Sequence, residues 1–320
     1  MIEPFQLLER QIWIAPMGVK FWDVSTGSHV SSGLRVTAYP GIHQRQATHA
    51  FPNCSGTYVL HRAWGMREFE LGVRGGPFPE TVPPAQRFTI VVNDEERRFL
   101  PVRLEADLPT VGLFRWTMSG ERTPLDPPDG SLPLYTSTLR TAPAGMAVIR
   151  AELHEVLDEI VNGVRVTRPA SWAMLEARFN GGLLGRGIAD ERGRIVLIFA
   201  YPRPQNPLSG SGGSPLTAGP TRTPFLNQEW TVQLQAFYQP TVLLSPLSPI
   251  EPLSDQSIPK LNDIFAQSPA NLFLDKEETE PLTEVSLRYG PKVFVPPGSA
   301  TAGSPLNPTP LSILFVSPTG

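Results

Sequence analysis

The chain has 320 residues and a formal net charge of -3, from 27 lysines and arginines against 30 aspartates and glutamates. This balance provides no basic field that could neutralise several phosphates, so it argues against nucleic-acid binding. The 36 prolines are roughly twice the usual share. Because proline fixes φ and cannot donate a ladder hydrogen bond, the composition disfavours long helices.

Cysteine usage and the apolar pattern indicate where the protein resides. Cys54 is the only cysteine, so no intrachain disulfide can form and a reducing compartment is expected. Glu3, Pro4 and Glu9 precede any apolar run, unlike a secretory signal. No segment approaches ~20 uninterrupted apolar residues. We therefore predict a cytoplasmic protein, or part of a cytoplasmically assembled particle, without direct membrane insertion.

The first predicted module spans residues 1–122 and consists of short strands. Residues 33–39 alternate apolar and polar side chains and stop at a Pro-Gly pair, which is typical of a half-buried strand. Residues 88–92 and 98–104 flank a polar turn and predict a hairpin. Pro101 indicates that one of the two strands lies at a sheet edge.

A turn-rich bridge over residues 123–131 leads to a second predicted module, residues 132–240. Residues 147–160 begin as a strand, and their second half fits either a strand or a short helix. Residues 195–199 form a continuous β-branched and aromatic run, as in a strand buried on both faces. Residues 230–238 alternate clearly. The two modules follow a similar order of strands and Gly-centred turns, which fits either a tandem duplication or a coincidence of hairpin patterns.

Residues 241–320 change in character, because prolines recur every few residues between aliphatic and aromatic side chains. Such a segment is too apolar for a solvated linker, and its prolines interrupt both helices and ladders. We interpret it as an extended arm whose apolar side chains dock into its own modules or into neighbouring subunits, the last of them as an added strand. The alternative is a disordered tail. The predicted interaction residues are Leu243, Leu244, Leu247, Ile250, Leu253, Ile264, Phe265, Leu272, Phe273, Val293, Phe294, Ile313, Leu314 and Phe315.

Two turn-and-strand segments carry a resemblance to a known family. Residues 21–27 with 33–40, and residues 187–195, resemble the carboxypeptidase-regulatory-like (transthyretin-like) sandwich domain, in which an Asp-x-x-Gly turn joins strands. Residues 52–56, 98–101, 147–151 and 189–193 together resemble proteins associated with phage-tail-like contractile injection systems. The resemblance implies a mainly β fold with two tandem Ig-like or transthyretin-like β-sandwich modules, followed by the proline-rich arm.

The same resemblance implies a structural function. The regulatory domain is noncatalytic, so no catalytic residue carries over. The expected protein is a baseplate, cap or other tail-associated subunit that forms a homo-oligomeric ring, with tube, sheath or baseplate proteins as partners. The alternative is a module that binds a ligand or carbohydrate through exposed loops such as residues 41–53 and 207–224.

Residue patterns for catalysis or metal binding are weak. The five histidines are His29, His43, His49, His61 and His154. Without a paired-cysteine or HExxH pattern, they do not predict the three converging ligands of a metal site, and no cofactor is expected. A catalytic thiol at Cys54 would need an activating base, and an idle thiol is the simpler interpretation.

The remaining candidates also have structural interpretations. The neighbouring acids Asp190 and Glu191, and those at residues 94–96, are interpreted as hairpin turns in which Asp caps its own backbone. The tryptophans are interpreted as core residues rather than as a sugar-binding face.

Overall fold

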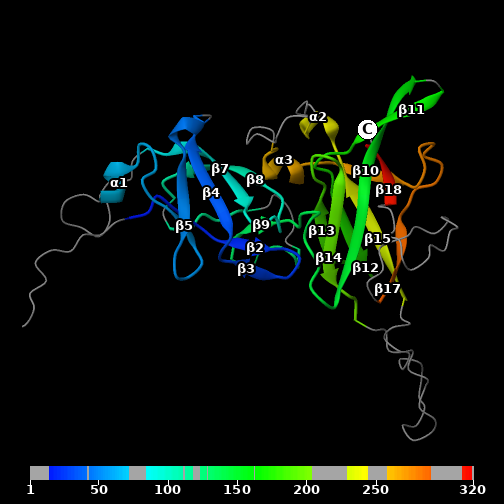
Figure 1. Ribbon diagram of the computed structural model, residues 1–320, viewed down its shortest axis with the longest axis horizontal. Helices are drawn as coiled ribbons and strands as arrows, with labels where there is room; N and C mark the ends of the chain where they lie inside the picture. The colour runs from blue at the N-terminus through cyan, green and yellow to red at the C-terminus, as the bar shows by residue number, and fades with distance from the viewer. Residues whose placement is uncertain are drawn as a thin grey trace, which may run out of the picture.

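The computed structural model describes residues 14–41, 43–71, 84–110, 112–117, 123–127, 129–161, 163–203, 229–243, 258–289 and 312–318. The chain is mainly β, and its strands gather into two groups along the long axis of the molecule (Figure 1). Within the described residues, no helix is both long and apolar enough to cross a membrane.

The first group of strands is built around a six-stranded antiparallel sheet with the order β1-β6-β5-β4-β7-β8. Its strands β4 and β7 are paired along seven positions, from Leu34 opposite Asp94 to Pro40 opposite Phe88. The bounds of the six are β1 Met17–Val19, β4 Leu34–Pro40, β5 Thr48–Pro52, β6 Tyr58–Leu60, β7 Gln86–Asp94 and β8 Val102–Leu108. A 3-10 turn, η1 (Gln44–Gln46), and a short helix, α1 (Arg67–Leu71), accompany them.

A smaller sheet packs against this one and completes a two-layered, sandwich-like core. Its order is β3-β2-β9, with β2 at Phe21–Asp23, β3 at Ser28–Val30 and β9 at Leu132–Leu134. The ring of Phe21 in β2 meets that of Tyr58 in β6 edge-on, with centroids 5.2 Å apart. Both rings are almost fully buried, so the two sheets share one hydrophobic core.

The pairing of β9 corrects the predicted boundary between the modules. The sequence analysis assigned residues 132–134 to the second module, whereas β9 pairs in parallel with β2 of the first. Local patterns contain no signal for this pairing, because the two strands are more than a hundred residues apart. The predicted hairpin is confirmed as β7 and β8. The predicted edge position after Pro101 is confirmed as well, because β8 is the last strand of its sheet.

Nine described strands form the second sheet, which runs β11-β10-β18-β16-β15-β12-β13, with β14 paired to β10 and β17 to β15. The sheet curls until β13 lies against β14: a Cβ on Gly187 would be only 3.0 Å from the backbone oxygen of Val196. The buried alternation of β15 and the continuous burial of residues 195–199 in β14 are as predicted. The bounds are β10 Met146–Val161, β11 Val164–Pro169, β12 Met174–Phe179, β13 Gly182–Ile188, β14 Arg194–Ala200, β15 Glu229–Phe237, β16 Pro269–Phe273, β17 Glu284–Arg288 and β18 Ser312–Pro318.

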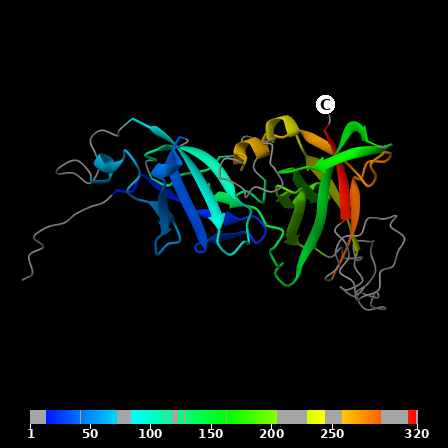
Figure 2. The ribbon, with the colours of Figure 1, turned by 45° about the horizontal axis from the view of Figure 1, so that its top comes forward.

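Strand β10 settles the choice left open for residues 147–160. It is a single strand of 16 residues, not a strand followed by a helix. Its first half pairs with β14 and its second half with β11, with a register irregularity between Val156 and Ile160. The second half and β11 form a hairpin that projects beyond the sheet (Figures 1 and 2).

The second sheet continues past the boundary predicted at residue 240. Strands β16, β17 and β18 all come from the predicted arm, and β18 lies between β10, to which it is parallel, and β16. Figure 2 shows β18, in red, beside the long green β10. Short helical segments, α2 (Pro240–Leu243) and α3 (Leu261–Phe265), precede these strands. In its described parts, the segment after 240 is therefore part of the fold.

One turn motif recurs four times in the described chain. In the turns headed by Asn53, Asp94, Asp190 and Asp275, the side-chain oxygen of the first residue accepts the backbone N–H four residues later. In each turn the residue three positions after the head has a positive φ: Gly56, Arg97, Gly193 and Glu278. This confirms the interpretation of Asp94 and Asp190 as turn caps. It also explains why these turns have similar sequences in both modules.

We predict that Leu314→Ala lowers the free energy of unfolding by about 2–5 kcal/mol, because Leu314 is fully buried in the core of the second sheet. Ile313→Ala is the matched control, since its side chain in the same strand is 48% exposed, and we expect a loss below about 1 kcal/mol. Urea unfolding followed by tryptophan fluorescence measures both. Equal losses in the two variants would show that β18 is not held in this register.

Candidate functional site

The described members of the predicted interaction set are mostly buried in their own chain. Leu243, Ile264, Leu272, Phe273, Leu314 and Phe315 are each less than a tenth exposed, Phe265 is partly buried, and Ile313 is 48% exposed. The other six, Leu244, Leu247, Ile250, Leu253, Val293 and Phe294, lie outside the described residues. This burial corresponds to the first of the two predicted alternatives, docking into the chain's own modules, and the last of these segments is an added strand, β18.

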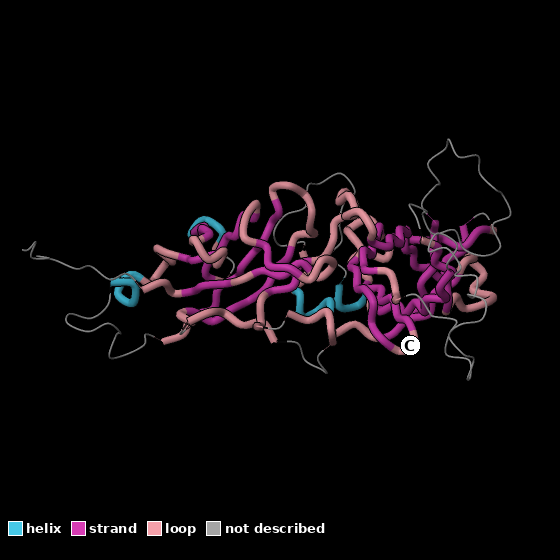
Figure 3. The backbone as a smooth tube through the Cα atoms, turned by 90° about the horizontal axis from the view of Figure 1, so that it is seen from below, coloured by secondary structure: helices cyan, strands magenta, loops and turns pink. Residues whose placement is uncertain are grey.

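Residues 258–267 connect the two modules. They directly precede β16 of the second sheet and pack on β8 of the first, and Ile258, Leu261 and Ile264 belong to the first module's core. Lys260 forms a bridge to β8 and an ion pair with Glu105 at 2.8 Å. Figure 3 shows the short helices α2 and α3, in cyan, between the two groups of strands. This connection covers the edge of β8, which would otherwise present unpaired backbone groups.

A buried cluster of charges lies at the same junction. The guanidinium of Arg186 in β13 is 2.7 Å from a carboxylate oxygen of Glu176 in β12 and 3.5 Å from one of Asp126 in the bridge. It also lies over the ring of Phe265 at 5.4 Å. All three charged side chains are less than a tenth exposed. Burial raises the pKa of the neighbouring Tyr135, so its phenol stays neutral.

The cluster fixes the relative positions of the chain segments that meet in it. Taking a guanidinium and two carboxylates out of water is costly, and the cost is offset only while the partners stay at these distances. Asp126 comes from the bridge, and Phe265 comes from residues 258–267, called the returning segment from here on. The cluster therefore holds three parts of the chain together. A sliding or hinging motion of the modules would leave buried charges unpaired. The arrangement favours a single relative orientation of the two modules.

A second ion pair fixes the connection on the other side of the junction. Arg140, in the linker before β10, is 2.6 Å from Asp23 at the end of β2. Burial alone would raise the pKa of Asp23, but hydrogen bonds from Arg140, Ser25 and Thr26 hold it below its ordinary value. The backbone oxygen of Arg140 accepts a bond from Arg150 of β10. The linker is thus bonded to both modules.

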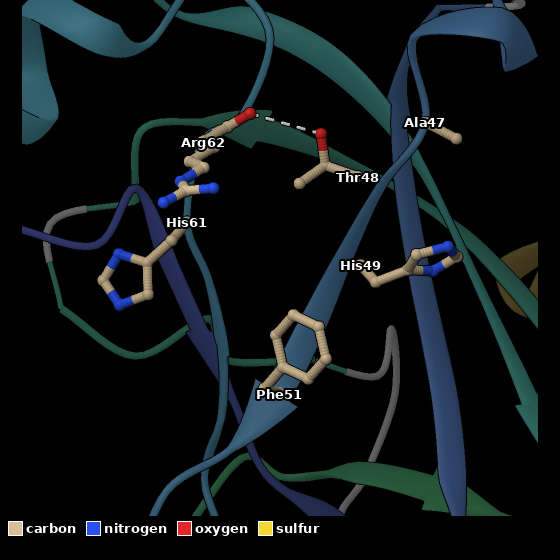
Figure 4. Close-up of a pocket in the computed structure, with 6 residues that line it drawn as sticks. All are labelled: Ala47, Thr48, His49, Phe51, His61 and Arg62. Atoms are coloured by element: carbon tan, nitrogen blue, oxygen red, sulfur yellow. Dashed lines mark hydrogen bonds between the residues drawn. The ribbon is translucent and has the colours of Figure 1, made fainter.

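The first module carries an open pocket of about 630 Å³ between β5 and the two residues that follow β6, away from the junction (Figure 4). Phe51 is 69% exposed there, and in Figure 4 its ring stands between the imidazoles of His49 and His61. His49 Nδ1 is 3.1 Å from Thr37 Oγ1, which orients that imidazole. Arg62 supplies the cation and has φ of 59°. An exposed ring beside a guanidinium suits an apolar group with acidic neighbours.

Several predicted candidates lie apart from this pocket. Cys54 is exposed in the turn after β5 and does not line the pocket. The described residues hold no group of three or more His, Cys, Asp or Glu that could bind a metal ion. The turns of Asp94 and Asp190 line one cleft of about 260 Å³, but both carboxylates are paired with Arg98 and Arg194, respectively. The core assignment of tryptophan is right for Trp116, Trp172 and Trp230, whereas Trp64 is 56% exposed.

Sequence reasoning missed the residues that make the junction and the pocket. Glu176 had a signal, because it is a charged residue inside an otherwise apolar strand, with Arg178 two positions later. No sequence pattern predicted that Arg186 would pair with carboxylates of β12 and the bridge, because only the fold brings β13 next to the bridge. The sequence analysis named residues 41–53 as a possible binding loop but did not single out Phe51, which the structure places in strand β5.

A scan of the chain against models of known protein families finds no match, and a search of the curated proteins finds no similar sequence. The resemblance to carboxypeptidase-regulatory-like domains and to injection-system proteins therefore stays a prediction.

We predict that Arg186→Met lowers the free energy of unfolding by about 3–5 kcal/mol, because Asp126 stays buried without a cation, while Glu176 keeps only its pair with Arg178 at 2.7 Å. Arg87→Ala is the matched control: its pair with Asp107 is solvent-exposed, and we expect almost no change. Denaturant unfolding of both variants gives the comparison. If Arg186→Met is as stable as Arg87→Ala, the buried cluster does not hold the junction.

We also predict an acid-dependent contribution from Asp23. Its folded-state pKa is lowered, so its stabilisation is complete above the unfolded-state pKa of about 4 and is lost as the pH falls through the lower folded-state value. Arg140→Met removes a main cause of the lowered pKa, so stability should fall less steeply with acid in this variant. Urea titrations at neutral pH and below pH ~4 test this. Parallel pH profiles of variant and wild type would contradict it.

Proposed function

We propose that the chain is a non-enzymatic structural subunit of a multiprotein particle. The observation that carries this proposal is the junction: residues 258–267 and the buried cluster around Arg186 tie two β modules into one body. A structural subunit that holds its neighbours in fixed relative positions must itself be rigid, and the junction makes the two modules one rigid body. Large apolar side chains are exposed at its two ends, Phe51 and Trp64 on the first module and Ile160 and Val164 on the second. Such exposed groups are typical of interaction surfaces.

The proposed particle is a phage-tail-like contractile injection system, in which this chain would be a baseplate, cap or tail-associated component. The support is the resemblance of the turn motifs quoted above, including residues 52–56 and 189–193. We further propose that both modules are of the Ig-like or transthyretin-like sandwich class. The two facing sheets of the first module and the recurring Asx-headed turns in both support this assignment. Partners would be tube, sheath or baseplate proteins and further copies of the chain.

Sedimentation of the native protein tests the proposed function. A cleared lysate of the source cells is run through a density gradient, and fractions are probed with an antibody against this chain. We expect the chain in fast fractions that contain tube and sheath proteins by mass spectrometry and rod-like particles by electron microscopy. Recovery of the chain only as a slow, free species would contradict the proposal.

A second candidate function is ligand or carbohydrate binding, and the open pocket at Phe51 favours it. An exposed ring flanked by imidazole and guanidinium groups can stack on a sugar and bond to its hydroxyls. A glycan array with the purified chain tests this function, with Phe51→Ala as the matched variant. Saturable binding that the variant loses would support it. Equal signals from both proteins would exclude this pocket as the binding site.

A further inference from the structure

We propose that copies of this chain associate head to tail, with the β10–β11 hairpin tip of one copy seated in the β5–β6 pocket of the next. The hairpin tip is defined as residues 158–161 and 163–165, and the pocket by His49, Phe51, His61 and Arg62. The inference rests on the proposed function, and it names the partner and the contact that such a subunit would use.

The hairpin tip has the features of an inserting element. Ile160, Val161 and Val164 are 66%, 48% and 55% exposed, and Val161 stands directly opposite Val164 across the hairpin. Three exposed aliphatic side chains at the end of a projecting hairpin are unfavourable in a free monomer. Because β10 continues into the core of the second module, the tip is mounted on a strand that is fixed at its base.

The pocket has the matching features. It is open, and its most exposed member is the apolar ring of Phe51. His49 and Phe51 flank the buried Ala50 in β5, so their side chains lie on the outer face of the six-stranded sheet, away from the core. An aliphatic tip laid against this ring would remove apolar surface of both partners from water.

Charge agrees with the same pairing. Asp158 and Glu159 at the tip are exposed, whereas the only basic residue of the tip, Arg165, is already 3.7 Å from Glu278. The pocket instead offers the exposed guanidinium of Arg62 and two imidazoles. Acidic residues around an apolar tip therefore meet the guanidinium of Arg62 and hydrogen-bonding imidazoles around an apolar ring, which orients the encounter and disfavours tip-to-tip contact.

The positions of the two surfaces determine the kind of assembly. Strand β5 and the β10–β11 hairpin lie toward opposite ends of the elongated molecule (Figures 1 and 2). Two different surfaces on one rigid body make a heterologous contact, which closes into a ring or continues as a filament instead of stopping at a dimer.

A complementation experiment tests the head-to-tail contact. Ile160→Asp damages only the tip, and Phe51→Asp damages only the pocket. We expect the wild-type chain to form species larger than a dimer at rising concentration in analytical ultracentrifugation. Each variant alone should remain monomeric, with self-association weakened more than roughly tenfold. An equimolar mixture should form a heterodimer, because the intact tip of one variant fits the intact pocket of the other.

Leu139→Asp is the matched surface control, since Leu139 is as exposed as Ile160, at 66%, but lies near the junction. It should associate like the wild type. The inference is overturned if the wild-type chain stays monomeric at every concentration, or if the mixed variants fail to pair. A wild-type chain that is monomeric alone but sediments with tube and sheath proteins would end this inference and leave the proposed function standing.

Discussion

The buried guanidinium of Arg186 is the constraint on which the arrangement of the two modules depends. Its carboxylate partners come from a strand of the second module and from the bridge, and the ring beneath it comes from the returning segment. An ion cluster of this kind adds little net stability compared with a well-packed apolar core, but it is strongly destabilised when one partner moves. It therefore selects one orientation of the modules among several that apolar packing alone would permit.

Two segments from the part of the chain after residue 240 also cover strand edges of the two sheets. Residues 258–267 cover β8, and β18 fills the space between β10 and β16, so two strand edges that would promote aggregation are occupied from within the chain. The apolar residues of the predicted arm, which the sequence analysis expected to dock on other surfaces, take part in covering these edges. Among the apolar side chains that stay exposed in the described residues, those of the hairpin tip and Phe51 lie on two well-separated surfaces, and the proposed assembly uses these two surfaces.

Sequence patterns predicted the local structure well and the long-range structure poorly. Alternation identified β15, the continuous apolar run identified β14, and Asp190 was correctly interpreted as a turn cap, because each signal lies within a few residues. The parallel pair of β2 and β9, the docking of Ile264 on the first module and the partners of Arg186 are contacts between distant segments. The residues in each of these contacts are many tens of positions apart in the sequence, so the local periodicity of apolar residues does not predict them.

The most direct test of the account is a distance measurement between the modules. Cys54, the single and exposed cysteine of the first module, and a Glu284→Cys substitution on the exposed face of β17 provide two sites for spin labels. Pulsed electron spin resonance then reports the distribution of distances between them. The account predicts one narrow distribution in the wild-type background and a broadened one when Arg186 is replaced by Met. A broad distribution in the wild-type background would mean that the modules move independently, and the rigid-body account would be wrong.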